Sequence, residues 1–160
     1  MEPIDVIELL ERDHRMLDEL VAELDDAEDT DAIRHVFLRI VEALSAHEVV
    51  EHDVLYPAYR AAFGADDDET LSHRMAEHEE LNELLAEMRG LAPDGFAFLK
   101  RGSALLLEMQ GHFQAEEETV FARMRRDMSP ELLADLGRQA VVAKSHAPVF
   151  PGNPRTLTAS

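Results

Sequence analysis

The sequence contains no cysteine and no tryptophan, and it is poor in basic residues. The absence of cysteine excludes disulfides, iron–sulfur clusters and thiol chemistry. Lysine and arginine together number 15 against 34 aspartates and glutamates, which gives a formal net charge of −19. Such a charge repels nucleic acid and anionic lipid and attracts cations, so neither nucleic acid nor a membrane is expected as a partner.

Long apolar runs are also missing from the 160 residues. No stretch approaches the roughly 20 apolar residues of a membrane-spanning helix. The N-terminus lacks the basic region and apolar run of a signal peptide. We therefore expect a cytoplasmic location. The sequence does not indicate an oligomeric state.

Leucine, alanine, glutamate, arginine and methionine dominate the composition, which favours helices over strands. Apolar residues recur at steps of three and four and predict four long helices. Asp5 and Glu8 have the spacing of a capping box at the start of the first helix. Thr30 or Asp31 is expected to cap the second helix, and Pro57 should end or kink it. The third helix is expected over about residues 68–89.

The fourth helix follows a break at residues 90–95, and a shorter fifth helix starts at Ser129-Pro130 and ends near Lys144. We therefore expect an all-α protein, an up-down-up-down four-helix bundle with a short fifth C-terminal helix. One domain is predicted over residues 1–145. Residues 146–160 contain three prolines and are expected to form an irregular tail.

Polar residues interrupt the apolar stripe of all four long helices. On the second helix, His47 and Glu51 lie between Leu44 and Val54 at the spacing that points into the bundle. The stripe of the fourth helix continues to Thr119. The inward-facing histidines and glutamates are His14, His47, Glu51, His78, His112 and Glu116.

These residues form a repeat. The first half of the chain reads His, then His-x-x-x-Glu, and the second half has the same order 64 or 65 residues later. The His-x-x-x-Glu spacing alone carries little weight, because eight histidines with one glutamate in eight residues give about one such pair by chance. His73 and Glu77, which lie off the stripe, are interpreted as that background. The convergence of six inward groups from four helices is the stronger signal.

A metal centre is the most economical explanation of six buried polar groups, because burying them without partners is costly. One tetrahedral zinc ion binds four ligands and would leave the remaining buried groups without a metal. Two six-coordinate ions bridged by Glu51 and Glu116 would use all six, and nitrogen and oxygen ligands without sulfur suit iron or manganese. A ferritin-like di-iron site is disfavoured, since the only Glu-x-x-His pair is Glu11/His14.

The arrangement resembles the hemerythrin-like family, specifically its HHE cation-binding domains. The resemblance covers roughly residues 5–128. The motifs that carry it are Asp13-His14, His47-x-x-x-Glu51, the run from Glu77 to Leu81, and His112-x-x-x-Glu116.

This resemblance implies a non-haem centre of two irons, bridged by oxygen and carboxylates, with the six inward residues as ligands. Oxygen-carrying members have a His-x-x-x-His pair on the third helix and a later aspartate. Here His73 and His78 are five residues apart, and Glu116 is the last ligand. The site is therefore expected to be more oxygen-rich and more open.

The sequence leaves the function open among three classes. A binding or sensing protein would hold iron and take up dioxygen, peroxide or nitric oxide. An enzyme with catalase-like, peroxidase-like or ferroxidase activity would use the same open positions. In the third class the metal is structural and the acidic surface binds protein partners. Glu48 and Tyr56 are further candidates for the site, as is His73 if the start of the third helix is distorted. His35, His52 and His146 are expected at the surface.

Overall fold

The computed structural model describes residues 4–64 and 66–148, and this part of the chain is helical without strands. The all-α prediction is thereby confirmed. The helices, with η marking a π-helical turn, are α1 (Val6–Asp26), α2 (Thr30–Val50), η1 (Glu51–Leu55), α3 (Tyr56–Phe63), α4 (Asp68–Arg89), α5 (Phe96–Glu116), η2 (Glu117–Phe121), α6 (Ala122–Asp127) and α7 (Pro130–Ser145).

Side-chain caps fix several helix starts. Asp5 accepts a hydrogen bond from the Glu8 amide at the start of α1, and Ser129 accepts one from the Leu132 amide at the start of α7, as the capping signals predict. The cap of α2 is Asp29, which accepts from the Ala32 amide, so the expected cap at Thr30 or Asp31 is wrong by one or two residues.

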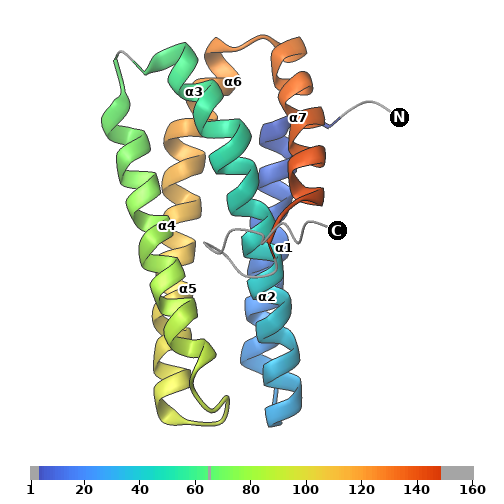
Figure 1. Ribbon diagram of the computed structural model, residues 1–160, viewed down its shortest axis with the longest axis vertical. Helices are drawn as coiled ribbons and strands as arrows, with labels where there is room; N and C mark the ends of the chain where they lie inside the picture. The colour runs from blue at the N-terminus through green and yellow to red at the C-terminus, as the bar shows by residue number, and fades with distance from the viewer. Residues whose placement is uncertain (1–3, 65, 149–160) are drawn as a thin grey trace, which may run out of the picture.

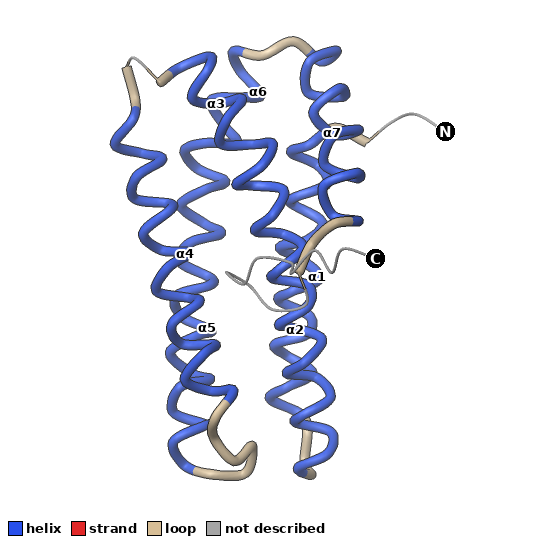
Figure 2. Tube along the Cα trace, in the orientation of Figure 1, coloured by secondary structure: helices blue, strands red, loops and turns tan. Residues whose placement is uncertain are grey.

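The long helices run in two pairs, α1 beside α2 and α4 beside α5, as Figure 1 shows. Short loops join them at the ends of the bundle (Figure 2). The fifth helix of the sequence prediction, α7, packs against α1, α2 and η1. The up-down order and the domain boundaries at 1–145 and 146–160 stay predictions. Of the expected tail, residues 149–160 lie outside the described part.

The second helix does not end at Pro57. It continues from α2 through η1 into α3, and Pro57 lies in the first turn of α3, directly after the π turn. The wider π turn holds one more residue per turn than an α-helix and shifts the inward face by one position. The same shift at η2 turns Val120 inward and leaves Thr119 exposed, which corrects the predicted stripe.

Two apolar clusters occupy the interior, one toward each end of the bundle. On α1, Leu10 belongs to the first cluster and Leu17 to the second, and His14 lies between them. On α2, Val50 and Leu44 bracket His47 in the same way. The inward polar residues thus form a layer enclosed by apolar packing. In the described part of the chain, no helix has the length and hydropathy required to cross a membrane.

Candidate metal centre

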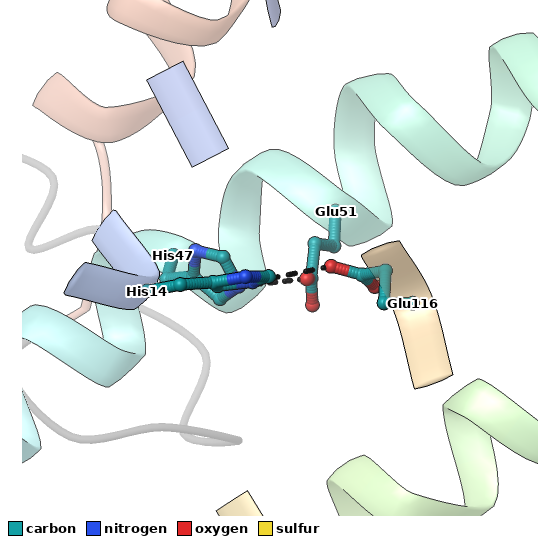
Figure 3. Close-up of side chains that lie close together, drawn as sticks. All are labelled: His14, His47, Glu51 and Glu116. Carbon is teal, nitrogen blue, oxygen red and sulfur yellow. Dashed lines mark ion pairs between the residues drawn. The ribbon is translucent and has the colours of Figure 1, made fainter. Parts of the chain in front are cut away.

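The six inward polar residues meet in one buried cluster, and each is at most 2% exposed. Their ligand atoms fall into two groups of four, and within each group all atoms lie within 4.8 Å of one another. The first group consists of His14, His47, Glu51 and Glu116, whose side chains lie close together in Figure 3. The second group consists of Glu51, His78, His112 and Glu116. Both groups contain the same two glutamates.

Each of these glutamates directs one oxygen to each group. The Oε1 atom of Glu51 lies 2.7 Å from Nε2 of His47, and its Oε2 atom lies 2.6 Å from Nε2 of His78. For Glu116, Oε1 lies 3.4 Å from Nε2 of His14 and Oε2 lies 3.7 Å from Nε2 of His112. The two carboxylates thus span the two groups of donor atoms.

Five of the eight donor atoms that face the cluster centre lack hydrogen-bond partners. They are Nε2 of His14, Nε2 of His47, both carboxylate oxygens of Glu51 and Oε1 of Glu116. Buried polar atoms are rarely left in this state, because each costs free energy to desolvate. Imidazole nitrogens and carboxylate oxygens without sulfur are the donor set that iron and manganese accept. The residues present therefore fit a metal centre.

The charged groups of the cluster shift one another's pKa values. Burial lowers the pKa of His47, but the carboxylates of Glu51 and Asp13 outweigh burial and raise that pKa to about 10. Burial acts in the same direction on His112, but the nearby carboxylates of Glu51 and Glu77 raise its pKa to about 10 as well. In the absence of a metal, both imidazoles are therefore in the positively charged form at neutral pH, with a proton on each ring nitrogen.

The pKa values of Glu51 and Glu116 are shifted in opposite directions. Burial raises the pKa of Glu116, and the negative charge of Glu51 raises it further. Burial also acts to raise the pKa of Glu51, but the neighbouring His47 and His78 lower it well below its ordinary value. Two carboxylates so close together do not both ionise readily unless cations lie between them.

In two histidines of the cluster, the ring nitrogen that faces outward meets a carboxylate on the residue before another histidine of the cluster. His47 Nδ1 lies 3.2 Å from Oδ2 of Asp13, and His112 Nδ1 lies 2.5 Å from Oε2 of Glu77. Such partners fix the ring orientation and leave Nε2 free for a metal. By sequence spacing alone, the pair His73 and Glu77 is interpreted as a chance match. Glu77 nevertheless belongs to the surroundings of the cluster, because it contacts His112.

In each of the other two histidines, the outer partner is the residue that follows one of the two shared glutamates. His14 Nδ1 lies 3.0 Å from Oε1 of Glu117, and His78 Nδ1 lies 2.9 Å from Nε2 of His52. His52 is exposed, as expected from the sequence, and it also contacts the cluster through His78. These partners could have been found from the repeat, since Asp13 aligns with Glu77 and His52 with Glu117 at the offsets of the inward residues.

Of the three further candidate ligands, one contacts the cluster, one is buried outside both groups of donors, and one is exposed. The Tyr56 hydroxyl donates to Oε2 of Glu116 at 2.8 Å and lies 3.3 Å from Nε2 of His78. Glu48 is buried with Oε1 unpaired, but it belongs to neither group of four. His73 is exposed and belongs to neither group.

A polar pocket of about 530 Å³ reaches the cluster between α1 and α5. His14 forms part of its wall, so one imidazole separates the pocket from the centre. The other lining residues are Arg15, Asp18, Gln110, Phe113, Gln114 and Glu117.

A family comparison agrees with this arrangement. The Hemerythrin HHE cation binding domain model matches residues 5–103 and 75–146 of the chain. The chain belongs to the hemerythrin HHE cation-binding domain family. The resemblance inferred from the motifs is confirmed.

Two relatives and one solved structure are similar to the chain. A protein of Nostoc sp. named DNA nickase is 29% identical over 142 residues, which are 89% of this chain and 40% of that protein. An uncharacterised hemerythrin-like protein of Schizosaccharomyces pombe is 24% identical over 75% of this chain and 59% of its own length. The chain thus spans less than two thirds of these relatives.

An HHE cation-binding domain-containing protein from Mycobacterium kansasii shares the fold, with a TM-score of 0.73 at 18% identity. The match covers 89% of this chain and 86% of that one.

Proposed function

We propose that this HHE domain holds a non-haem di-iron centre that binds dioxygen, peroxide or nitric oxide. The observation that carries the proposal is the sharing of Glu51 and Glu116 between two histidine pairs. His14, His47 and one oxygen of each glutamate would hold one ion, and His78 and His112 with the other two oxygens would hold the second. The centre would supply redox-active iron with open positions for a small ligand.

The number of donors favours two iron ions over one zinc ion. Each group offers four donors, which is the full shell of a tetrahedral zinc site, but a single zinc would leave two buried histidines without a metal. A six-coordinate iron with four protein donors keeps about two positions open. The polar pocket that His14 lines lies next to these positions, with the His14 imidazole between the pocket and the centre.

Iron loading tests the proposal. The protein is expressed in iron-supplemented medium in air, and its iron content and absorption spectrum are measured before and after addition of azide or nitric oxide. We expect about two irons per chain, near-ultraviolet charge-transfer bands, and a spectral change on adding either ligand. One tightly held zinc ion per chain, with no iron uptake, would contradict the proposal.

Tyr56 is placed to donate a hydrogen bond to a bound ligand. Burial and the negative charge of Glu116 raise the pKa of Tyr56 well above its ordinary value, so the phenol keeps its proton. In the Tyr56→Phe variant we expect azide to leave the iron-loaded protein about three- to tenfold faster, the effect of losing one hydrogen bond. Stopped-flow displacement measures this rate.

Tyr59→Phe is the matched control for this prediction. Tyr59 is also buried on α3, but its hydroxyl donates to Asp67, away from the cluster. Equal azide release from both variants and the wild type would show that Tyr56 does not contact the ligand.

Metal binding is expected to release protons. The metal-free protein carries protons on His47 and His112, whose pKa values are about 10, and a metal needs the lone pair that each proton occupies. At pH 7.5 loading with Co²⁺ should therefore release about two protons, and the affinity should rise with pH toward 10 and fall below pH 7. An indicator dye in weakly buffered solution measures the release. Loading without acidification would contradict these pKa shifts.

The proposal does not include nucleic acid. The net charge of −19 would repel a phosphate backbone, and the match to the Nostoc protein covers 40% of that protein. The absence of a nucleic-acid partner stays a prediction, as does the cytoplasmic location.

A further inference from the structure

The helix appended to the bundle contacts the metal centre through one carboxylate. Lys144, in the last turn of α7, donates from Nζ to Oδ1 of Asp13, and Oδ2 of the same carboxylate meets His47 Nδ1 at 3.2 Å. The Asp13 side chain is 7% exposed and that of Lys144 is 28% exposed. An ammonium, a carboxylate and an imidazole therefore follow one another from α7 to the first group of donors.

The second half of the chain has the same sequence of groups, built differently. Arg74 Nη2 lies 2.8 Å from Oε1 of Glu77, whose Oε2 meets His112 Nδ1. There the cation lies on the same helix as the carboxylate, three residues before it. In the first half the corresponding cation comes from α7, more than 130 residues along the chain from Asp13. The first group of donors therefore depends on a helix outside the four-helix bundle.

The position of Lys144 is set by close packing of α7. A side chain at Gly137 would collide with the backbone carbonyl of Ile4, so glycine permits α7 to approach the start of α1. Leu133, Leu136 and Ala140 on the same helix join the apolar cluster above the metal centre. Displacement of α7 would remove the ammonium from Asp13 and leave its carboxylate free to turn away from His47.

We propose that Lys144 is a positioning residue of the metal centre, so that metal binding beside His47 and docking of α7 stabilise each other. The inference rests on the proposed metal-binding function. A carboxylate held at both oxygens keeps the His47 ring oriented with Nε2 toward the cluster. Because coupling between two sites is reciprocal, a metal that needs this orientation must also favour the docked state of α7.

A pair of substitutions on the same helix tests the role of Lys144. Lys144→Met removes the contact with Asp13, and Arg138→Met removes an equal charge from an exposed residue that pairs with Asp135. Co²⁺ is titrated into each metal-free protein and followed by absorption and calorimetry. We expect one of the two Co²⁺ ions to bind about tenfold more weakly in Lys144→Met, the lower end of the effect of an outer partner.

Arg138→Met should match the wild type, and Lys144→Arg should recover most of the affinity. A purely structural role for Lys144 would lower thermal stability but leave the Co²⁺ affinity of the folded protein unchanged. Equal affinities in Lys144→Met and Arg138→Met would overturn the inference, while the proposed function would stand. Failure of the wild type to bind Co²⁺ or iron at all would instead overturn the proposed function.

Hydrogen exchange of the wild type tests the reverse direction without a variant. Amide exchange in α7 should slow by at least about threefold when Co²⁺ is added. Linkage requires this, because if the docking of α7 strengthens metal binding, metal binding must strengthen the docking of α7. Exchange in α7 that is identical with and without bound Co²⁺ would overturn the inference.

Discussion

Exchange of Glu51 for glutamine is expected to remove both metal ions from the protein. Glu51 lies in both groups of donors, with one oxygen 2.7 Å from Nε2 of His47 and the other 2.6 Å from Nε2 of His78. Glutamine keeps the volume but loses the charge, and it turns an NH₂ donor toward one ion. We expect the affinity for both ions to fall by more than about 100-fold, beyond the effect of losing an outer partner.

Two other substitutions make this prediction specific. His14 belongs to the first group alone, so His14→Ala should leave one ion bound. Glu118→Gln removes an equal charge from an exposed residue of η2 that belongs to neither group, and it should bind as the wild type does. Metal analysis after equilibrium dialysis measures all three. Two bound ions in Glu51→Gln would show that this glutamate does not bridge the centre.

Removal of the metal is expected to destabilise the fold strongly. Without cations the buried cluster retains unpaired donor atoms on His14, His47, Glu51 and Glu116, and the two carboxylates repel each other. A metal at 1,000 times its Kd adds about 4 kcal/mol per site, and about 2–4 °C of Tm per kcal/mol for a chain of this size gives a shift of about 8–16 °C per site.

Calorimetry of the iron-loaded and the chelator-treated protein measures the shift. The Glu51→Gln variant is the control, because its Tm should be the same with and without added metal. A wild-type Tm that does not change on chelation would contradict a metal centre in the core of the bundle.

Much of the fold could be predicted because it depends on local signals. Asp5 and the Ser129-Pro130 pair mark helix starts through hydrogen bonds within one turn. The inward face of each helix follows from the spacing of apolar residues, which brought His14 and His78 onto the stripe with the leucines. The π turns could not be predicted, because their extra residue is a response to packing. Thr119 was therefore placed inward where the structure has Val120.

The outer partners were missed because they lie at the rim of each helix face. Glu77 and Glu117 are partly or largely exposed, and hydropathy does not distinguish them from other surface acids. The repeat carried a usable signal, since Glu77 follows Asp13 by 64 residues and Glu117 follows His52 by 65 residues, the offsets of the inward residues next to them. No local pattern predicts the contact between Lys144 and Asp13, because it depends on how α7 packs against α1.

Anomalous diffraction at the iron absorption edge, from crystals of the iron-loaded protein, tests the central claim most directly. We predict two iron peaks per chain between Glu51 and Glu116, one next to His14 and His47 and the other next to His78 and His112. A single peak, or peaks outside the space between the two glutamates, would contradict a di-iron centre bridged by these residues.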